Sequence, residues 1–108
     1  MSSPIFGTYT SDGRSWTVVH LIKAAEQLPI TDIQVSDLEE QLRRPVWSET
    51  ETPWQVMGHM ARIQEADLSY PILIAPDGRI MDGCHRLARA VMEGARTITA
   101  KKFPEWPE

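Results

Sequence analysis

Residues 80–86 read Ile-Met-Asp-Gly-Cys-His-Arg, and the rest of the chain is organised around them. The apolar pair before Asp82 ends a strand, Gly83 permits a sharp turn, and the residues after it begin a helix. A strand that turns through glycine into a helix N-terminus is an anion site, because free N–H groups and the positive end of the helix dipole face the same place. His85 and Arg86 add side-chain donors there, so these two are the strongest candidates for contacts to a ligand. The alternative is that they form a polar helix start that pairs at the surface with Asp82 or Glu93.

A hairpin is predicted immediately before this stretch. The apolar run at residues 71–75 is followed by Pro-Asp-Gly at residues 76–78. Pro fixes φ and Gly supplies a positive φ, so this tripeptide predicts a tight turn between two strands. After Gly83, residues 84–93 predict a helix that stops before Gly94, a usual residue just past a helix end. Three- and four-residue spacing predicts a buried stripe on this helix, formed by Cys84, Leu87, Ala88 and Val91.

The other elements are predicted from caps, breakers and spacing. A helix begins after Thr17 and is stopped by Pro29, a short strand covers residues 30–35, and a capping box opens a short helix over residues 36–42. The longest helix opens at residues 52–55, Thr-Pro-Trp-Gln, which supply a cap, a first-turn proline and the box residue. Its predicted buried stripe is formed by Val56, Met57, Met60 and Ile63. A last strand covers residues 97–103.

These elements predict one small α+β domain, in which a short mixed sheet packs with about four helices. We place this domain at residues 16–103. Residues 1–15 are rich in Ser, Thr, Gly and Pro without a sustained period, and they are predicted to be an N-terminal tail. Residues 104–108 contain two prolines and are predicted to be a C-terminal tail or an edge cover.

Composition is that of an ordinary soluble domain. The chain has 108 residues, of which 42% are hydrophobic and 24% charged. A single cysteine excludes an internal disulfide framework. No apolar run approaches the roughly 20 residues that a membrane helix needs, and the first four residues lack the basic and apolar regions of a signal peptide. We therefore expect no membrane partner and a cytoplasmic location.

The charge pattern argues against a protein that binds DNA on its own. The formal net charge is −4, whereas proteins that neutralise DNA phosphates are usually basic. The acids gather around residues 37–51, and the basic residues cluster late in the chain. This arrangement predicts a positive pocket on an acidic body, which suits a small anion better than a long polyanion. The late basic residues are Arg79, Arg86, Arg89, Arg96, Lys101 and Lys102.

The turn at residues 82–86 resembles the ParB/sulfiredoxin superfamily. ParB-type domains are similar to it through Gly83, His85, Arg86 and Ala88, and sulfiredoxins more literally through Gly-Cys-His-Arg at residues 83–86. Free-serine kinases of this superfamily resemble it through Asp-Gly-x-His-Arg. The resemblance covers residues 70–103, about a third of the chain. It implies a ParB/sulfiredoxin-like fold, and it implies that the matching turn, Gly83 to Arg86, holds the phosphates of a nucleotide such as ATP, ADP or CTP with Mg²⁺.

Asp82 and Cys84 are the candidates for catalytic residues. Asp82 could hold Mg²⁺, orient an attacking hydroxyl or bond a ribose, but it could equally cap the helix that follows. Cys84 lies at a helix N-terminus beside His85 and Arg86, a setting that should lower the pKa of its thiol and make it a nucleophile. Its place in the apolar stripe offers the alternative that it only packs.

His59 and Arg62 are spaced three residues apart on the long helix, away from its apolar stripe. They could form a second wall of the anion pocket, or they could belong to a solvated polar face. The chain shows no cluster of residues with zinc spacing, so Mg²⁺ through Asp82 is the one metal we consider.

Three functions remain open at this point. The first is a nucleotide-binding domain, with phosphoryl transfer or slow hydrolysis as the reaction if there is one. The second is a binding module for DNA or protein in a partition or regulatory system; the sequence shows no helix-turn-helix after the last strand, which argues against chromosome segregation by this chain alone. The third is a sulfiredoxin-like reduction through Cys84. The sequence leaves open the nucleotide, the acceptor and the oligomeric state.

Overall fold

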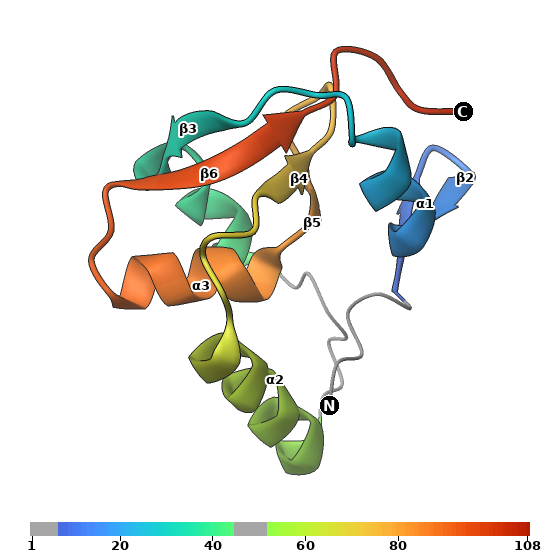
Figure 1. The fold of residues 1–108 in the computed structure, drawn as a ribbon. Helices are drawn as coiled ribbons and strands as arrows, with labels where there is room; N and C mark the ends of the chain where they lie inside the picture. The colour runs from blue at the N-terminus through green and yellow to red at the C-terminus, as the bar shows by residue number, and fades with distance from the viewer. Residues whose placement is uncertain (1–6, 45–51) are drawn as a thin grey trace.

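A four-stranded mixed sheet forms the centre of the protein, with the strand order β3-β6-β4-β5. The structure is a computed structural model that describes residues 7–44 and 52–108. β6 (Thr97–Lys102) lies between β3 (Thr31–Gln34), to which it is antiparallel, and β4 (Ile72–Ile74), to which it is parallel. β4 also pairs with β5 (Ile80–Asp82) in the predicted hairpin. With α1 (Val18–Ala24), α2 (Pro53–Glu65) and α3 (Cys84–Met92), this sheet makes the α+β domain that the sequence predicts (Figure 1).

The two faces of the sheet pack into two separate cores. Along β4 the side chains alternate, so Ile72 and Ile74 enter one core while Leu73 enters the other. The first core lies between the sheet and α3, which contributes Leu87 and Ala90. The second core is covered by α1 and by aromatic residues from both ends of the described chain. Its buried members are Trp16, Leu21, Ala25, Leu73, Ala75, Met81 and Phe103.

The prediction of an N-terminal tail is wrong for the described residues 8–15. β1 (Thr8–Ser11) and β2 (Arg14–Thr17) form an antiparallel hairpin, closed by a turn in which Asp12 and Gly13 both have positive φ. Asp-Gly is a strong hairpin signal, and it was present in the sequence. Residues 1–6 lie outside the described part.

The C-terminal residues are a cover for the second core and not a tail. The ring of Trp106 stacks on that of Trp16, with centroids 5.5 Å apart. The carbonyl oxygen of Pro107 accepts hydrogen bonds from Trp16 Nε1 at 2.9 Å and from Arg14 Nη2 at 3.0 Å. Of the two alternatives in the sequence, the tail is therefore wrong, and the segment covers a core.

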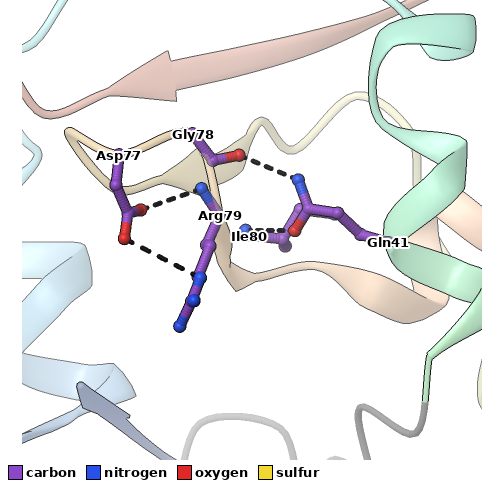
Figure 2. A network of polar contacts seen from close by, with 5 residues as sticks. All are labelled: Gln41, Asp77, Gly78, Arg79 and Ile80. Atoms are coloured by element: carbon purple, nitrogen blue, oxygen red, sulfur yellow. Dashed lines mark hydrogen bonds and ion pairs between the residues drawn. The ribbon is translucent and has the colours of Figure 1, made fainter. Parts of the chain in front are cut away.

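The helix predicted over residues 36–42 is replaced by two 3₁₀ turns, η2 (Val35–Asp37) and η3 (Glu39–Arg43), and neither has a side-chain cap. Figure 2 shows what η3 does: it presents Gln41 to the β4–β5 turn. The amide of Gln41 donates to the carbonyl of Gly78 at 2.8 Å, and its oxygen accepts from the N–H of Ile80 at 3.0 Å. One side chain thus bonds two backbone groups at the edge of the sheet, where no other strand of the described residues pairs with β5.

The start of α2 is as predicted, but its buried face is not. Thr52 and Gln55 form the capping box, with both reciprocal hydrogen bonds present. Val56, Met57 and Met60 were predicted to be buried, yet they are 44%, 60% and 54% exposed. α2 packs against α3 and contributes no fully buried side chain to either core. The spacing of the apolar residues correctly predicted an amphipathic helix, but it could not show whether another element covers the apolar face of that helix.

α1 and α3 follow their predictions more closely. Thr17 caps α1 by accepting the N–H of His20, and Val18, Leu21 and Ala25 are buried. α3 begins at Cys84 and ends before Gly94. Its buried stripe is shifted, because Leu87 and Ala90 are buried whereas Ala88 is half-buried and Val91 is 36% exposed. None of the helices that the structure describes is long and apolar enough to cross a bilayer.

Candidate functional site

A cleft of about 650 Å³ opens beside the turn that joins β5 to α3. One wall comes from α1, a second from the C-terminal part of α2, and the floor from the turn itself. Tyr70, Pro71 and Lys101 complete the lining. Its volume lies in the range of sites that bind small molecules. The structure therefore brings three of the four predicted ligand residues, Gly83, His85 and Arg86, to one cavity.

Gly83 is held in place by packing. Its φ is +116°, and a Cβ added to it would come within 2.4 Å of Cγ2 and 2.8 Å of Cβ of Ile72. This lets β4 lie directly against the start of α3. Gly83 is also the N-cap residue of α3, and its carbonyl accepts the N–H of Leu87. The glycine is thus required by the core whether or not a ligand is bound.

Arg86 is bound to the protein itself. Its Nη2 lies 2.8 Å from Oδ2 of Asp82, and its Nη1 donates to the carbonyls of Pro71 at 3.1 Å and Tyr70 at 3.3 Å. The two side chains of the ion pair are only 18% and 14% exposed. Arg86 lies off the buried stripe of α3, yet its guanidinium ties the entry to β4 to the end of β5. Pairing with Asp82, the alternative that the sequence allowed, is what the structure shows.

The structure excludes one of the roles considered for Asp82. Its carboxylate does not cap α3, because the N-cap is Gly83 and no side chain makes the cap hydrogen bond. Instead it neutralises Arg86 inside the lining of the cleft. Of the alternatives raised from the sequence, the helix cap is therefore wrong.

His85 pairs with His59 from α2. Nε2 of His85 lies 2.8 Å from Nδ1 of His59, and the two rings stack with centroids 5.1 Å apart. Burial, together with His59 and the cations Arg62 and Arg86, lowers the pKa of His85 from 6.5 to about 4. The imidazole is therefore neutral at physiological pH.

Of the two α2 residues predicted to form a second wall, one lines the cleft. Arg62 lines the cleft together with His85, whereas His59 is not among the described lining residues and contacts His85 from α2. Within residues 7–44 and 52–108, no carboxylate lies close enough to Arg62 to form an ion pair. Among the described residues, Arg62 is thus the arginine of the cleft that no carboxylate neutralises.

Cys84 does not have the acidic thiol that its position suggested. Burial, and secondarily the negative charge of Asp82, raise its pKa from 9.0 to about 11, against the smaller opposing effect of Arg86. The side chain is partly buried and packs on the first core. The packing alternative is the one the structure supports, because a protonated thiol is a poor nucleophile.

The charge of the cleft is mixed, so the prediction of a positive pocket is wrong. Arg62, Arg86 and Lys101 line it, but so do four acidic residues, Glu26, Glu65, Asp67 and Asp82. Lys101 is also engaged, since its Nζ donates to the carbonyl of Ala25 at the C-terminus of α1. An anion would therefore find its favourable end beside Arg62 and the first turn of α3.

The described residues include no group of three or more His, Cys, Asp or Glu side chains that could hold a metal ion. Mg²⁺ is usually bound by one or two carboxylates together with phosphates. Asp82 is the acidic residue of the turn, and its carboxylate is engaged by Arg86. The protein residues alone therefore do not fit a resident Mg²⁺ ion.

Comparisons of the chain with protein families, curated proteins and solved structures find no match. The ParB/sulfiredoxin resemblance of residues 82–86 therefore stays a prediction.

The sequence did not identify the α1 wall of the cleft, which consists of Val18, Ile22 and Glu26. These residues recur every four positions, so they lie along one side of α1 and its C-terminal extension. Ile22 has the helical spacing of a core residue relative to Val18 and Leu21, but it is 44% exposed and lines the cleft. The sequence did contain an indication of this wall. Ile22 lies on the same side of the helix as Glu26, and an acidic residue rarely lies in a core, so this pattern indicates a side that faces solvent or a cleft.

Proposed function

We propose that this protein binds a nucleotide, or a closely related phosphate ester, in the cleft between α1, α2 and the β5–α3 turn. The observation that carries the proposal is that α2 brings Arg62 to the same cavity as Gly83 and His85 at the start of α3. The family resemblance of residues 82–86 supports the same ligand. We place the phosphates at this end of the cleft.

Three features of this end favour a phosphate. The guanidinium of Arg62 can donate two parallel hydrogen bonds to phosphate oxygens. The first turn of α3, a nine-residue helix, directs backbone N–H groups and the positive end of its dipole toward the anion. His85 is neutral and half-buried, so this end of the cleft carries no further charge there that must be desolvated.

Arg86 and Asp82 hold the turn in shape. Their ion pair and the hydrogen bonds from Arg86 to Tyr70 and Pro71 fix where α3 begins relative to β4. Mg²⁺ would reach this site bound to the phosphates of the nucleotide, where it neutralises their charge.

We propose that the cleft binds its ligand, and we assign no catalysed reaction to it. Asp82 is bonded to Arg86, the Cys84 thiol is protonated, and His85 is in contact with His59. The side chains that the sequence offered for chemistry are thus engaged by the protein or in an inactive protonation state.

A thermal-shift panel of the full chain tests this proposal. ATP, ADP, CTP and GTP with Mg²⁺ should each raise the melting temperature, whereas adenosine, which lacks phosphate, should not. At a hundred times its Kd a ligand stabilises the folded state by about 2.7 kcal/mol, which is readily measured. Equal shifts from ATP and adenosine, or no shift from any nucleotide, would overturn the proposal.

A further inference from the structure

We infer that the cleft holds the non-phosphate half of its ligand by apolar contact and does not distinguish one nucleobase from another. The inference rests on the proposed function, and it names the ligand class more closely: nucleoside phosphates as a group, recognised by an anionic end and a flat apolar end.

The α1 side of the cleft supplies the apolar end. Val18 and Ile22 lie there, and Pro71 continues the same surface from the strand side. The lining of the cleft is predominantly apolar. Ile22 is 44% exposed, so it presents hydrocarbon to a ligand without being needed to fill either core. A base placed against this wall would bury both its own face and the side chain of Ile22.

The carboxylates of Glu26, Glu65 and Asp67 line the cleft but are exposed to solvent, so they need no bond from a base. Other polar groups that could read the edge of a base are engaged. The carbonyls of Tyr70 and Pro71 accept from Arg86, and the ammonium of Lys101 donates to Ala25. Sites discriminate strongly between similar ligands when they bury polar groups that only the right ligand satisfies, and weakly when they offer hydrocarbon. The surface formed by Val18, Ile22 and Pro71 is of the second kind.

Tyr70 adds a second apolar surface at the rim. It lines the cleft and is 63% exposed. Stacking of a base on an aromatic ring tolerates any base, because every base has a π-face. Tyr70 and Ile22 therefore favour a planar group over a bare polyphosphate without selecting among planar groups.

Titration calorimetry of the full chain with ATP, GTP, CTP, UTP and inorganic tripolyphosphate tests the inference. We expect the four nucleotides to bind within about threefold of one another and each about tenfold more tightly than tripolyphosphate, which has the same number of phosphates and no base. Ile22→Ser should remove most of that advantage. Val19→Ser is the matched control, since Val19 lies on the same helix, is 52% exposed and does not line the cleft.

Each outcome either supports or overturns the inference. A preference of more than about tenfold for one nucleotide would show base readout and overturn the inference, and so would tripolyphosphate binding as tightly as ATP; in both cases the phosphate site stands. Equal effects of Ile22→Ser and Val19→Ser would overturn the placement of the base. Absence of binding by all five compounds would overturn the proposed function together with this inference. Melting curves of both variants, which alter exposed residues, confirm that they are folded.

Discussion

Gly83 lies so close to Ile72 that a Cβ added to the glycine would come within 2.4 Å of Cγ2 of the isoleucine. Gly83→Ala should therefore lower the free energy of unfolding by about 2–5 kcal/mol, from the positive φ and from overpacking together. Urea denaturation measures this. Gly94→Ala is the matched control, because Gly94 also has a positive φ but no atom within 4 Å of the added Cβ. Equal losses for the two variants would show that the contact with Ile72 is unimportant.

Arg86 should be more important for stability than an exposed ion-pair arginine. Arg86→Ala leaves the carboxylate of Asp82 buried without its partner, so it should cost about 3 kcal/mol of unfolding free energy. Arg86→Lys should recover only part, because lysine cannot reach the carboxylate and the two carbonyls with one planar group. Arg43→Ala is the comparison: Arg43 pairs with Glu40 at the surface, where both side chains are 70% exposed, and its loss should cost under about 1 kcal/mol. Similar melting curves for the two alanine variants would contradict the structural role of Arg86.

The thiol of Cys84 should react slowly in the native protein. Its pKa of about 11 leaves almost no thiolate at neutral pH. Labelling by iodoacetamide should therefore be slow at neutral pH, rise as the pH passes about 9, and become fast when the chain is unfolded in urea. Rapid labelling of the native protein at neutral pH would restore the nucleophile that the sequence suggested.

Stability should fall on mild acidification because of His85. Its pKa is about 4 in the folded protein and about 6.5 in the unfolded chain, so between these values the unfolded state binds the proton more readily. The free energy of unfolding is unaffected above that window and decreases as the pH falls through it. His85→Asn should flatten this part of the profile, measured by urea denaturation between about pH 7 and about pH 5. An unchanged slope in the variant would show that His85 is not held neutral by the fold.

Local backbone chemistry explains what could be predicted from the sequence. The β4–β5 turn, the glycine before α3, the capping box at Thr52 and the glycine after α3 are each specified by residues within a few positions. Contacts between distant segments could not be predicted in this way. The carbonyl of Pro71 that accepts from Arg86, and the histidine of α2 that meets His85, come from parts of the chain whose approach no local pattern specifies.

The same limit explains the errors on α2 and on the cleft. Val56, Met57 and Met60 have helical spacing, but spacing cannot say whether another element covers that side. Ile22 has core spacing on α1, yet it faces the cleft. Arg62 could be proposed as a second wall because it avoids the apolar stripe, and the structure places it in the lining.

The affinity of ATP for the Arg62→Ala variant tests the central claim most directly. Titration calorimetry should show binding weaker than wild type by about ten- to a hundredfold, the loss expected for a charge-assisted hydrogen bond to phosphate, with little change in the melting temperature of the free protein. Arg62→Lys should recover part of the affinity. Arg96→Ala, which removes an exposed arginine outside this cleft, should bind ATP as wild type does. If Arg62→Ala binds ATP as tightly as wild type and Arg96→Ala do, the phosphates do not lie between Arg62 and the start of α3, and the proposed site is wrong.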